Sequence, residues 1–128
     1  MNKTLGIRHI ALKVENFTQC LDFYHRVLKM DIDWQPDDEN VYLTNGRDNL
    51  ALHYDSKLEK TSQCRLDHFG ILLPKRKDVD EWHQYISKEN VKIFKGLHDH
   101  RDGSRSFYCE DPDGNIVQLI WHPKISLC

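Results

Sequence analysis

The sequence predicts an α+β fold built from two βαβββ modules, and three observations carry this prediction. A strand pattern with one histidine occurs twice, over residues 7–14 and 66–73. Each copy is followed by an apolar stripe with the 3.6-residue period of a helix. Each stripe is followed in turn by three short stretches with the composition of strands. The chain has 128 residues, enough for one domain, so two repeats of about half that length are expected to share it.

The first module begins with a strand whose two faces differ. Ile10, Leu12 and Val14 form an apolar face, and His9 lies on the other face because successive strand residues point to opposite sides. Asn16 and Gln19 have the spacing of a capping box, so a helix is expected to begin there. Its apolar residues recur at helical spacing: Phe17, Leu21, Tyr24 and Leu28. Three strands should follow, over residues 30–34, 41–44 and 50–54.

The second module repeats this plan. His68 has the same place in the strand over residues 66–73 as His9 has in the first copy. Asp78 with Glu81 predicts the start of the second helix, and Asn90 predicts its left-handed end. The apolar residues of this helix are Val79, Trp82, Tyr85 and Ile86. The three strands expected after it cover residues 91–94, 106–110 and 116–121, with a tight turn over residues 111–114.

One face of each sheet is expected to stay open, because the helix of the module covers the apolar face. His9, His68 and Gln118 all have the strand parity of the open face. Two imidazoles that meet on a shared face are useful mainly to a metal ion, since histidine is a common ligand of divalent metals.

Composition and charge exclude several classes of partner. The net charge is −2 with Lys and Arg scattered, which predicts no nucleic-acid partner. No apolar stretch approaches the ~20 residues of a membrane span, and the N-terminus lacks the core of a signal peptide. The cysteines show no CxxC spacing, so we expect reduced thiols and a cytoplasmic protein. They are Cys20, Cys64, Cys109 and Cys128.

Four segments resemble the vicinal oxygen chelate superfamily, which includes glyoxalase I, bleomycin-resistance proteins, fosfomycin-resistance thiol transferases and extradiol dioxygenases. The segments are residues 7–14, 23–28, 67–70 and 106–115. The resemblance implies one domain over residues 1–128, with internal repeats of about 5–57 and 64–123. It also implies an open barrel-like cup with the helices outside, closed either within one chain or between two. A small-molecule substrate and a homodimer are expected accordingly.

The resemblance also implies a set of metal ligands. The ligands that relatives take from the first strand of each module fall on His9 and His68, and the ligand from the last strand, usually Glu, falls on Gln118. The equivalent place in the first module is Ala51, which cannot bind a metal. The cofactor implied is a divalent ion (Ni, Zn, Mn or Fe). Because an amide carries no charge, Gln118 should weaken the site and disfavours an Fe(II) dioxygenase.

Three further residues are candidates for catalysis. Tyr108 shares strand parity with Ser106 and Glu110 and should face the cup, where its hydroxyl could bind a substrate. His53 lies two residues beyond Ala51 on the same strand face, as a proton acceptor or a substitute ligand. Glu110 or a bound water is the alternative group for moving a proton.

Other positions depart from the fosfomycin-type relatives. Ala11 stands where they have Thr, and His98 and Asp102 stand where they bind an anion through Lys and Ser. Fosfomycin resistance is therefore not expected. The polar segment over residues 96–105 is predicted to be a loop near the mouth of the cup, from which Arg101 or Arg105 could steer an anionic substrate.

Three functions follow from these features. The first is a metal-dependent lyase or isomerase of the glyoxalase type, similar to lactoylglutathione lyase. The second is a metal-free protein that binds a small molecule, as bleomycin-resistance proteins do. The third, disfavoured by Gln118, is an extradiol-type dioxygenase.

Overall fold

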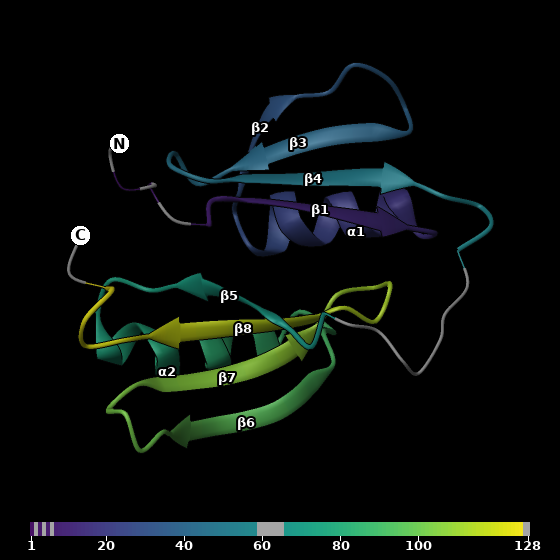
Figure 1. Ribbon diagram of the computed structural model, residues 1–128. Coiled ribbons are helices and arrows are strands. Elements are labelled where there is room, and N and C mark those ends of the chain that lie inside the picture. The colour runs from purple at the N-terminus through teal and green to yellow at the C-terminus, as the bar shows by residue number, and fades with distance from the viewer. Residues whose placement is uncertain (2, 4, 6, 59–65, 127–128) are drawn as a thin grey trace. The chain divides into compact units, whose positions relative to one another are not determined.

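The computed structural model describes residues 1, 3, 5, 7–58 and 66–126. The chain forms two compact units, Met1–Lys60 and Thr61–Cys128, named module 1 and module 2 below. Each module contains a four-stranded sheet with a helix on one of its faces (Figure 1). The predicted α+β class and the two βαβββ modules are confirmed. Each sheet is open and does not close into a barrel by itself.

Module 1 contains six elements in the predicted order. They are β1 (His9–Val14), α1 (Phe17–Asp22), a π-helical turn η1 (Phe23–Val27), β2 (Asp31–Trp34), β3 (Asn40–Thr44) and β4 (Asn49–Tyr54). The strand order is β1-β4-β3-β2, with β1 parallel to β4 and the other pairs antiparallel. The first strand of the module therefore pairs with its last strand, which makes their side chains neighbours on the open face of the sheet.

The helix of module 1 differs in detail from the expectation. Asn16 is its N-cap as predicted, but the Asn16 side chain makes no capping hydrogen bond, so the predicted capping box is wrong. From Phe23 the helix widens, and the Leu28 N–H donates to the Phe23 carbonyl 2.9 Å away, five residues back. The chain leaves the helix through Lys29 at φ +60°, a conformation that usually favours glycine.

Module 2 contains five elements. They are β5 (Phe69–Leu72), α2 (Arg76–Ser87), β6 (Ile93–Asp99), β7 (Arg105–Glu110) and β8 (Ile116–Trp121). The strand order β5-β8-β7-β6 repeats that of module 1, again with the first and last strands parallel. Asn90 ends the helical region at φ +59°, as predicted.

Three boundaries in module 2 correct the sequence analysis. Helix α2 begins two residues before Asp78, whose carboxylate accepts a hydrogen bond from the Lys75 N–H at 3.0 Å rather than capping from outside the helix. Strand β5 is shorter than predicted, and His68 directly precedes it. Strand β6 continues to Asp99, so the predicted loop over residues 96–105 is reduced to a turn over residues 100–104.

The buried side chains confirm which strand faces the helices cover. In β1 and β5 the residues on the helix side are buried or half-buried, whereas His9, Ala11 and Gly70 are exposed. The largest fully buried side chains include Tyr24, Leu43 and Leu52 of module 1 and Ile86, Phe107 and Leu119 of module 2. No helix within the described residues has both the length and the apolar character that a membrane crossing requires.

The turn over residues 111–114 is held by Asp111. Its Oδ1 accepts hydrogen bonds from the N–H groups of Asp113 and Asn115 at 2.9 and 2.8 Å, and its Oδ2 accepts one from the Asn115 side chain at 2.8 Å. Gly114 takes φ +87°, which a residue with a Cβ rarely adopts. The Asp-Pro-Asp-Gly segment therefore has a structural role.

Two of the cysteines, Cys20 and Cys109, are buried in the cores of the modules and form no disulfide. Cys64 and Cys128 lie outside the described residues. Burial, together with the carboxylates of Asp111 and Glu110, raises the pKa of the Cys109 thiol to about 12.

Cys109 should therefore resist alkylation in the native protein. Because only the thiolate is nucleophilic, we expect iodoacetamide at about pH 8 to modify Cys109 at least ~100-fold more slowly in the folded chain than in urea. Peptide mass spectrometry measures this rate for Cys109 separately from the other cysteines. Equal rates in the two conditions would contradict the buried position.

Candidate functional site

The open face of module 2 carries a row of side chains set by strand register. Gly70 of β5, Gln118 of β8 and Tyr108 of β7 are consecutive partners across the sheet, and Lys95 of β6 pairs with Tyr108. A Cβ built on Gly70 would lie 3.6 Å from the Gln118 Oε1, so the Gln118 amide reaches over Gly70. Gln118 and Tyr108 therefore lie on the face that the sequence predicted.

The Gln118 amide is held by two hydroxyl groups. Its Nε2 donates to the Ser106 Oγ and to the Tyr108 Oη, each at 2.9 Å, and the Gln118 residue is only 7% exposed. Within the described residues the Oε1 of Gln118 accepts no hydrogen bond. The amide oxygen is thus the end of Gln118 that can bind a ligand.

His68 lies beside Tyr108, which accepts a hydrogen bond from this amide. Its Nδ1 is 2.6 Å from the Asp67 carboxylate, and its ring contacts Tyr108 edge-on at 5.2 Å between centroids. A carboxylate accepts hydrogen bonds, so Nδ1 carries the proton and Nε2 keeps its lone pair when His68 is neutral. His68, Tyr108 and Gln118 therefore form one contiguous polar cluster within module 2.

Ser106 extends this cluster toward a surface groove. The His100 Nε2 lies 2.6 Å from the Ser106 Oγ, and the His100 ring contacts His98 edge-on at 4.8 Å. The Lys95 ammonium lies 5.6 Å from the centre of the Tyr108 ring. The groove has a volume of about 590 Å³ and is lined by Lys95, Gly96, Leu97, His98, His100 and Tyr108.

On the open face of module 1, strand register places His9 and His53 on the same side of the sheet. His9 pairs with Asn49 and Lys13 pairs with His53, with the Ala11–Ala51 pair between them. The His9 Nδ1 lies 2.7 Å from the Asn49 Oδ1, and no described residue bonds its Nε2. His9 is therefore an exposed imidazole held through one nitrogen, like His68.

His53 is held by a longer chain of hydrogen bonds. Its Nδ1 lies 2.6 Å from the Asn40 Oδ1, and the Asn40 Nδ2 donates to the Asp37 carboxylate at 2.9 Å. The His53 ring also meets Tyr42 edge-on at 5.9 Å, and Tyr42 stacks on Trp34 at 5.2 Å. His53 thus stands half-buried beside an aromatic pair on the open face.

The two modules use the same strand register around these residues. Tyr42 pairs with Ala51 in module 1 as Tyr108 pairs with Gln118 in module 2. Ala51 therefore occupies in module 1 the strand position that Gln118 has in module 2, as the family resemblance implied. Module 1 has no side chain at that position that could bind a metal.

Glu110 lies at the end of β7 and is paired with a lysine. Its Oε2 is 3.2 Å from the Lys92 ammonium, and its N–H donates to the Lys92 carbonyl at 2.9 Å. Glu110 shares the parity of Tyr108, but its carboxylate is engaged in this ion pair.

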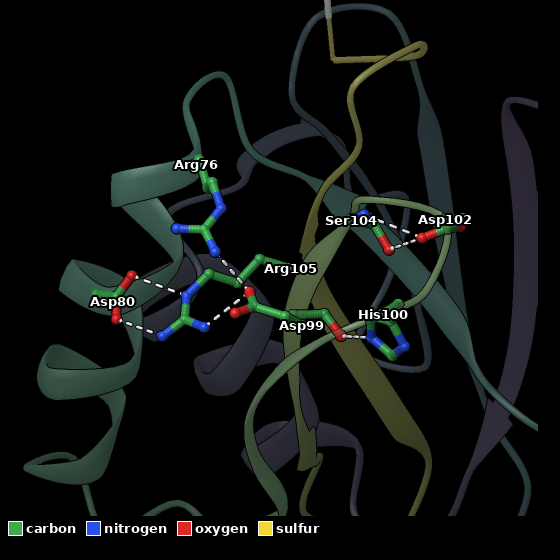
Figure 2. A network of polar contacts seen from close by, with 8 residues as sticks. Arg76, Asp80, Asp99, His100, Asp102, Ser104 and Arg105 are labelled. Carbon is green, nitrogen blue, oxygen red and sulfur yellow. Dashed lines mark hydrogen bonds and ion pairs between the residues drawn. The ribbon is translucent and has the colours of Figure 1, made fainter.

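The Arg105 side chain lies on the helix side of the sheet, not on the open face. Its guanidinium forms two hydrogen bonds with the Asp80 carboxylate, at 3.0 and 2.8 Å, and a third with Asp99 at 2.9 Å, while Arg76 also reaches Asp99 at 2.6 Å (Figure 2). The network ties α2 to β6 and β7. The interpretation that Arg105 could steer an anionic substrate is wrong, because its side chain is committed to the helix side of the sheet.

The turn beside this network is held by Asp102. Its Oδ1 accepts hydrogen bonds from the Ser104 N–H at 2.9 Å and from the Ser104 hydroxyl at 2.7 Å, as Figure 2 shows. The N–H of Ser104 and the carboxylate thus close the turn that leads from His100 into β7. Asp102 therefore has a structural role in this turn.

Sequence analysis missed the partners that orient the candidate residues. Asp67 and Ser106 had a local signal, since one adjoins His68 and the other shares the parity of Tyr108. Asn49 and Asn40 had no local signal, because Asn49 is 40 residues away from His9 and Asn40 is 13 residues away from His53.

Comparison with known proteins identifies the family. A family model described as the Glyoxalase/Bleomycin resistance protein/Dioxygenase superfamily matches residues 6–119. The chain belongs to this superfamily. It is 28% identical over 116 residues to the metallothiol transferase FosB of Staphylococcus saprophyticus, covering 89% of this chain and 75% of that protein. It is 26% identical over 117 residues to the catechol-2,3-dioxygenase of Bacillus subtilis, covering 88% of this chain and 40% of that protein.

Solved structures with low sequence identity share the fold of this chain. A lactoylglutathione lyase from Agrobacterium tumefaciens has a TM-score of 0.77 and 22% identity, with 94% of this chain and 96% of that chain covered. An integron cassette protein from the Halifax Harbour sewage outfall has a TM-score of 0.79 and 17% identity, with 92% and 99% covered. At these identities the similarity shows the fold alone.

The donor atoms of the candidate ligands fit a divalent metal of the kind that this superfamily uses. Metal-binding histidines generally donate their second ring N–H to an oxygen, as the Nδ1 groups of His9 and His68 are placed to do. The third donor is the neutral Gln118 Oε1 where a carboxylate is usual. Within the described residues, no group of three or more His, Cys, Asp or Glu side chains is placed to hold a metal ion.

The Arg105 network should contribute measurably to stability. We expect Arg105→Met to lower the free energy of unfolding by about 1 kcal/mol through the Arg105–Asp80 pair, allowing for solvent screening. Arg101→Met is the matched control, since Arg101 is exposed. Chemical denaturation of both variants and the wild type measures the difference.

The same difference should depend on pH in one direction. Hydrogen bonds from Arg105 hold the pKa values of Asp80 and Asp99 below the ordinary aspartate range. A depressed carboxyl pKa stabilises the folded state fully above the unfolded value of about 3.9, and the contribution is lost as the pH falls through the lowered pKa. The difference in the free energy of unfolding between wild type and Arg105→Met should therefore shrink below about pH 4. A difference that grows in acid would contradict this prediction.

Proposed function

We propose that this protein is a metal-dependent lyase or isomerase of the glyoxalase type that acts on a small oxygen-chelating substrate. One observation carries the proposal. Each candidate ligand has its non-coordinating end held by a hydrogen bond: His9 by Asn49, His68 by Asp67, and Gln118 by Ser106 and Tyr108. The donor atoms that remain are His9 Nε2, His68 Nε2 and Gln118 Oε1. The name of a relative, a metallothiol transferase, supports the use of a metal.

These three donors suit Ni, Zn, Mn or Fe in the divalent state. Neutral imidazole nitrogens are ordinary ligands of all four ions, and an amide oxygen can complete the set. Because none of the three donors is charged, we expect weaker binding than in relatives with a carboxylate. When bound, the ion would polarise two neighbouring oxygens of a substrate and stabilise the negative charge that develops on them.

The protein residues supply orientation and proton transfer. The Tyr108 Oη accepts a hydrogen bond from Gln118, so its own O–H is available to donate to a substrate oxygen. His53 is the proposed base, since a neutral imidazole with a free nitrogen can accept a proton near neutral pH. Glu110 is the second candidate, but the Lys92 ammonium already occupies one of its oxygens.

Both modules are needed for this site, whether they come from one chain or from two copies. We therefore propose a homodimer, and a cytoplasmic location in keeping with the free thiols. Sedimentation equilibrium at micromolar concentration should give twice the chain mass of 15.2 kDa. A mass equal to one chain would leave only a site assembled within a single copy.

A metal-free binding protein is the second candidate function. It is favoured by the amide at Gln118, because no charged ligand lies in the candidate set. A dioxygenase is disfavoured for the same reason, since the usual Fe(II) triad of such enzymes contains a carboxylate.

Metal binding separates the two candidates. Protein made without a polyhistidine tag should bind Ni, Zn or Mn at about one ion per chain, measured by calorimetry and elemental analysis. His9→Ala and His68→Ala should each lower the affinity at least ~100-fold, because each removes one of three ligands. Gln118→Glu should raise it about tenfold or more, because a carboxylate adds a charge and can accept hydrogen bonds from Ser106 and Tyr108.

His83→Ala is the matched control for this experiment. His83 lies on α2 and packs edge-on against Phe107 at 5.1 Å, away from the proposed ligands. Its loss should leave the affinity unchanged. Wild-type protein that takes up none of the three ions would favour the metal-free function.

A further inference from the structure

A chain of hydrogen bonds on the open face of module 1 leads from Asp37 through Asn40 to His53. The Asp37 carboxylate accepts from the Asn40 Nδ2 through both oxygens, at 2.9 and 3.2 Å, and the Asn40 Oδ1 lies 2.6 Å from the His53 Nδ1. Asn40 and His53 are register partners across β3 and β4, so the backbone ladder itself sets the two side chains opposite each other.

We propose that Asp37 and Asn40 are positioning residues that hold the proton of His53 on Nδ1 and thereby present its Nε2 as a proton acceptor to a ligand. The catalytic use of that acceptor rests on the proposed function. The position of the proton does not, because it follows from these three side chains alone.

The direction of each hydrogen bond follows from the chemistry of the groups. An ionised carboxylate only accepts, so the nitrogen end of the Asn40 amide must face Asp37. The oxygen end therefore faces His53, and an amide oxygen also only accepts. The His53 Nδ1 must then be the donor, which leaves the lone pair of the neutral ring on Nε2.

Asp37 is well suited to orient the amide. The Glu39 N–H, at 2.8 Å, and the Asn40 amide hold the pKa of the Asp37 carboxyl below its ordinary range, so Asp37 stays ionised near neutral pH. The His53 ring is fixed on a second side by its edge-on contact with Tyr42. Rotation of the amide or of the ring would break at least one of these contacts.

This arrangement restricts the ligand that can meet Nε2. A ligand that hydrogen-bonds to the Nε2 of a neutral His53 must bring the hydrogen, such as an O–H, an N–H or an acidic C–H. In the transfer, the bond from that hydrogen to the substrate breaks and an N–H bond forms at Nε2, while the electron pair stays on the substrate. The imidazolium that results keeps its Nδ1–H bond to Asn40, and Asp37 stabilises its charge through the amide. A substrate that meets Nε2 through a hydrogen bond is therefore a proton donor.

The test is the tautomer of His53 in protein labelled with ¹⁵N. At about pH 8.5, where an ordinary imidazole with a pKa of about 6.5 is neutral, long-range ¹H–¹⁵N spectra distinguish a protonated ring nitrogen from a bare one. No metal or substrate is needed. Wild-type His53 should have its proton on Nδ1 with a preference of about tenfold or more over Nε2.

Variants at Asn40 provide the sharpest comparison. Asn40→Leu removes the acceptor and should reduce the preference for Nδ1 to about one or below, whereas Asn40→Asp keeps an acceptor and should retain it. Asp37→Ala, which frees the amide to rotate, should give an intermediate ratio. Asn49→Leu is the matched control, because it removes the acceptor of His9 and should leave His53 unchanged.

Two outcomes would overturn the proposal. One is a wild-type His53 with its proton on Nε2, and the other is an Asn40→Leu variant that folds, by its amide spectrum, and keeps the wild-type tautomer. A His53 with the expected tautomer in a protein that binds neither metal nor substrate would uphold the positioning role and contradict the proposed function instead.

Discussion

The pairing of the first and last strands in each module is the constraint on which the rest of the structure depends. The parallel ladders of β1 with β4 and of β5 with β8 set which side chains are neighbours on the open faces. A shift of one residue in either ladder would turn every second side chain to the helix side. The place of Gln118 over Gly70, and of His53 in the row of Lys13, both follow from this register.

The candidate residues on both open faces share a second feature: each is oriented by hydrogen bonds at one end of its side chain, and its other end is left for a ligand. The imidazoles of His9, His53 and His68 each have an oxygen within 2.7 Å of Nδ1, and the Gln118 amide has two hydroxyl partners at its nitrogen. A side chain held in this way loses less conformational entropy when its other end binds a ligand, since its rotamer is already selected. The same geometry suits a metal ligand and a base, because both uses need a neutral imidazole with its lone pair on Nε2.

The helix side of module 2 is fixed by charge rather than by packing alone. Arg105 joins α2 to β6 through carboxylates on both elements, and Asp102 closes the turn that returns the chain to β7. Ser106 follows Arg105 directly and faces the other side of the sheet, where it holds His100 and Gln118. The ion pairs on one side of β7 therefore help to keep the hydroxyl on the other side in place.

The sequence by itself determined the order of the elements and the faces of the strands. Strand parity is a local property with a period of two, so His9, Tyr108 and Gln118 could be assigned to the open face without coordinates. The family resemblance determined the candidate ligands in the same way, because it rests on short motifs. Helix starts were less certain, as Asp78 illustrates, since several polar residues in a row can serve as a cap.

Only the tertiary structure decided which groups orient these residues. Asn40 bonds to His53 from the neighbouring strand β3, and Asn49 bonds to His9 from the neighbouring strand β4, 40 residues along the chain. Asp80 binds Arg105 from helix α2. Each of these contacts depends on strand register and on the seating of a helix, and neither leaves a periodic trace in the sequence. The physical reason is that a hydrogen bond needs its two groups within about 3 Å, and only the folded chain sets that distance for residues far apart in sequence.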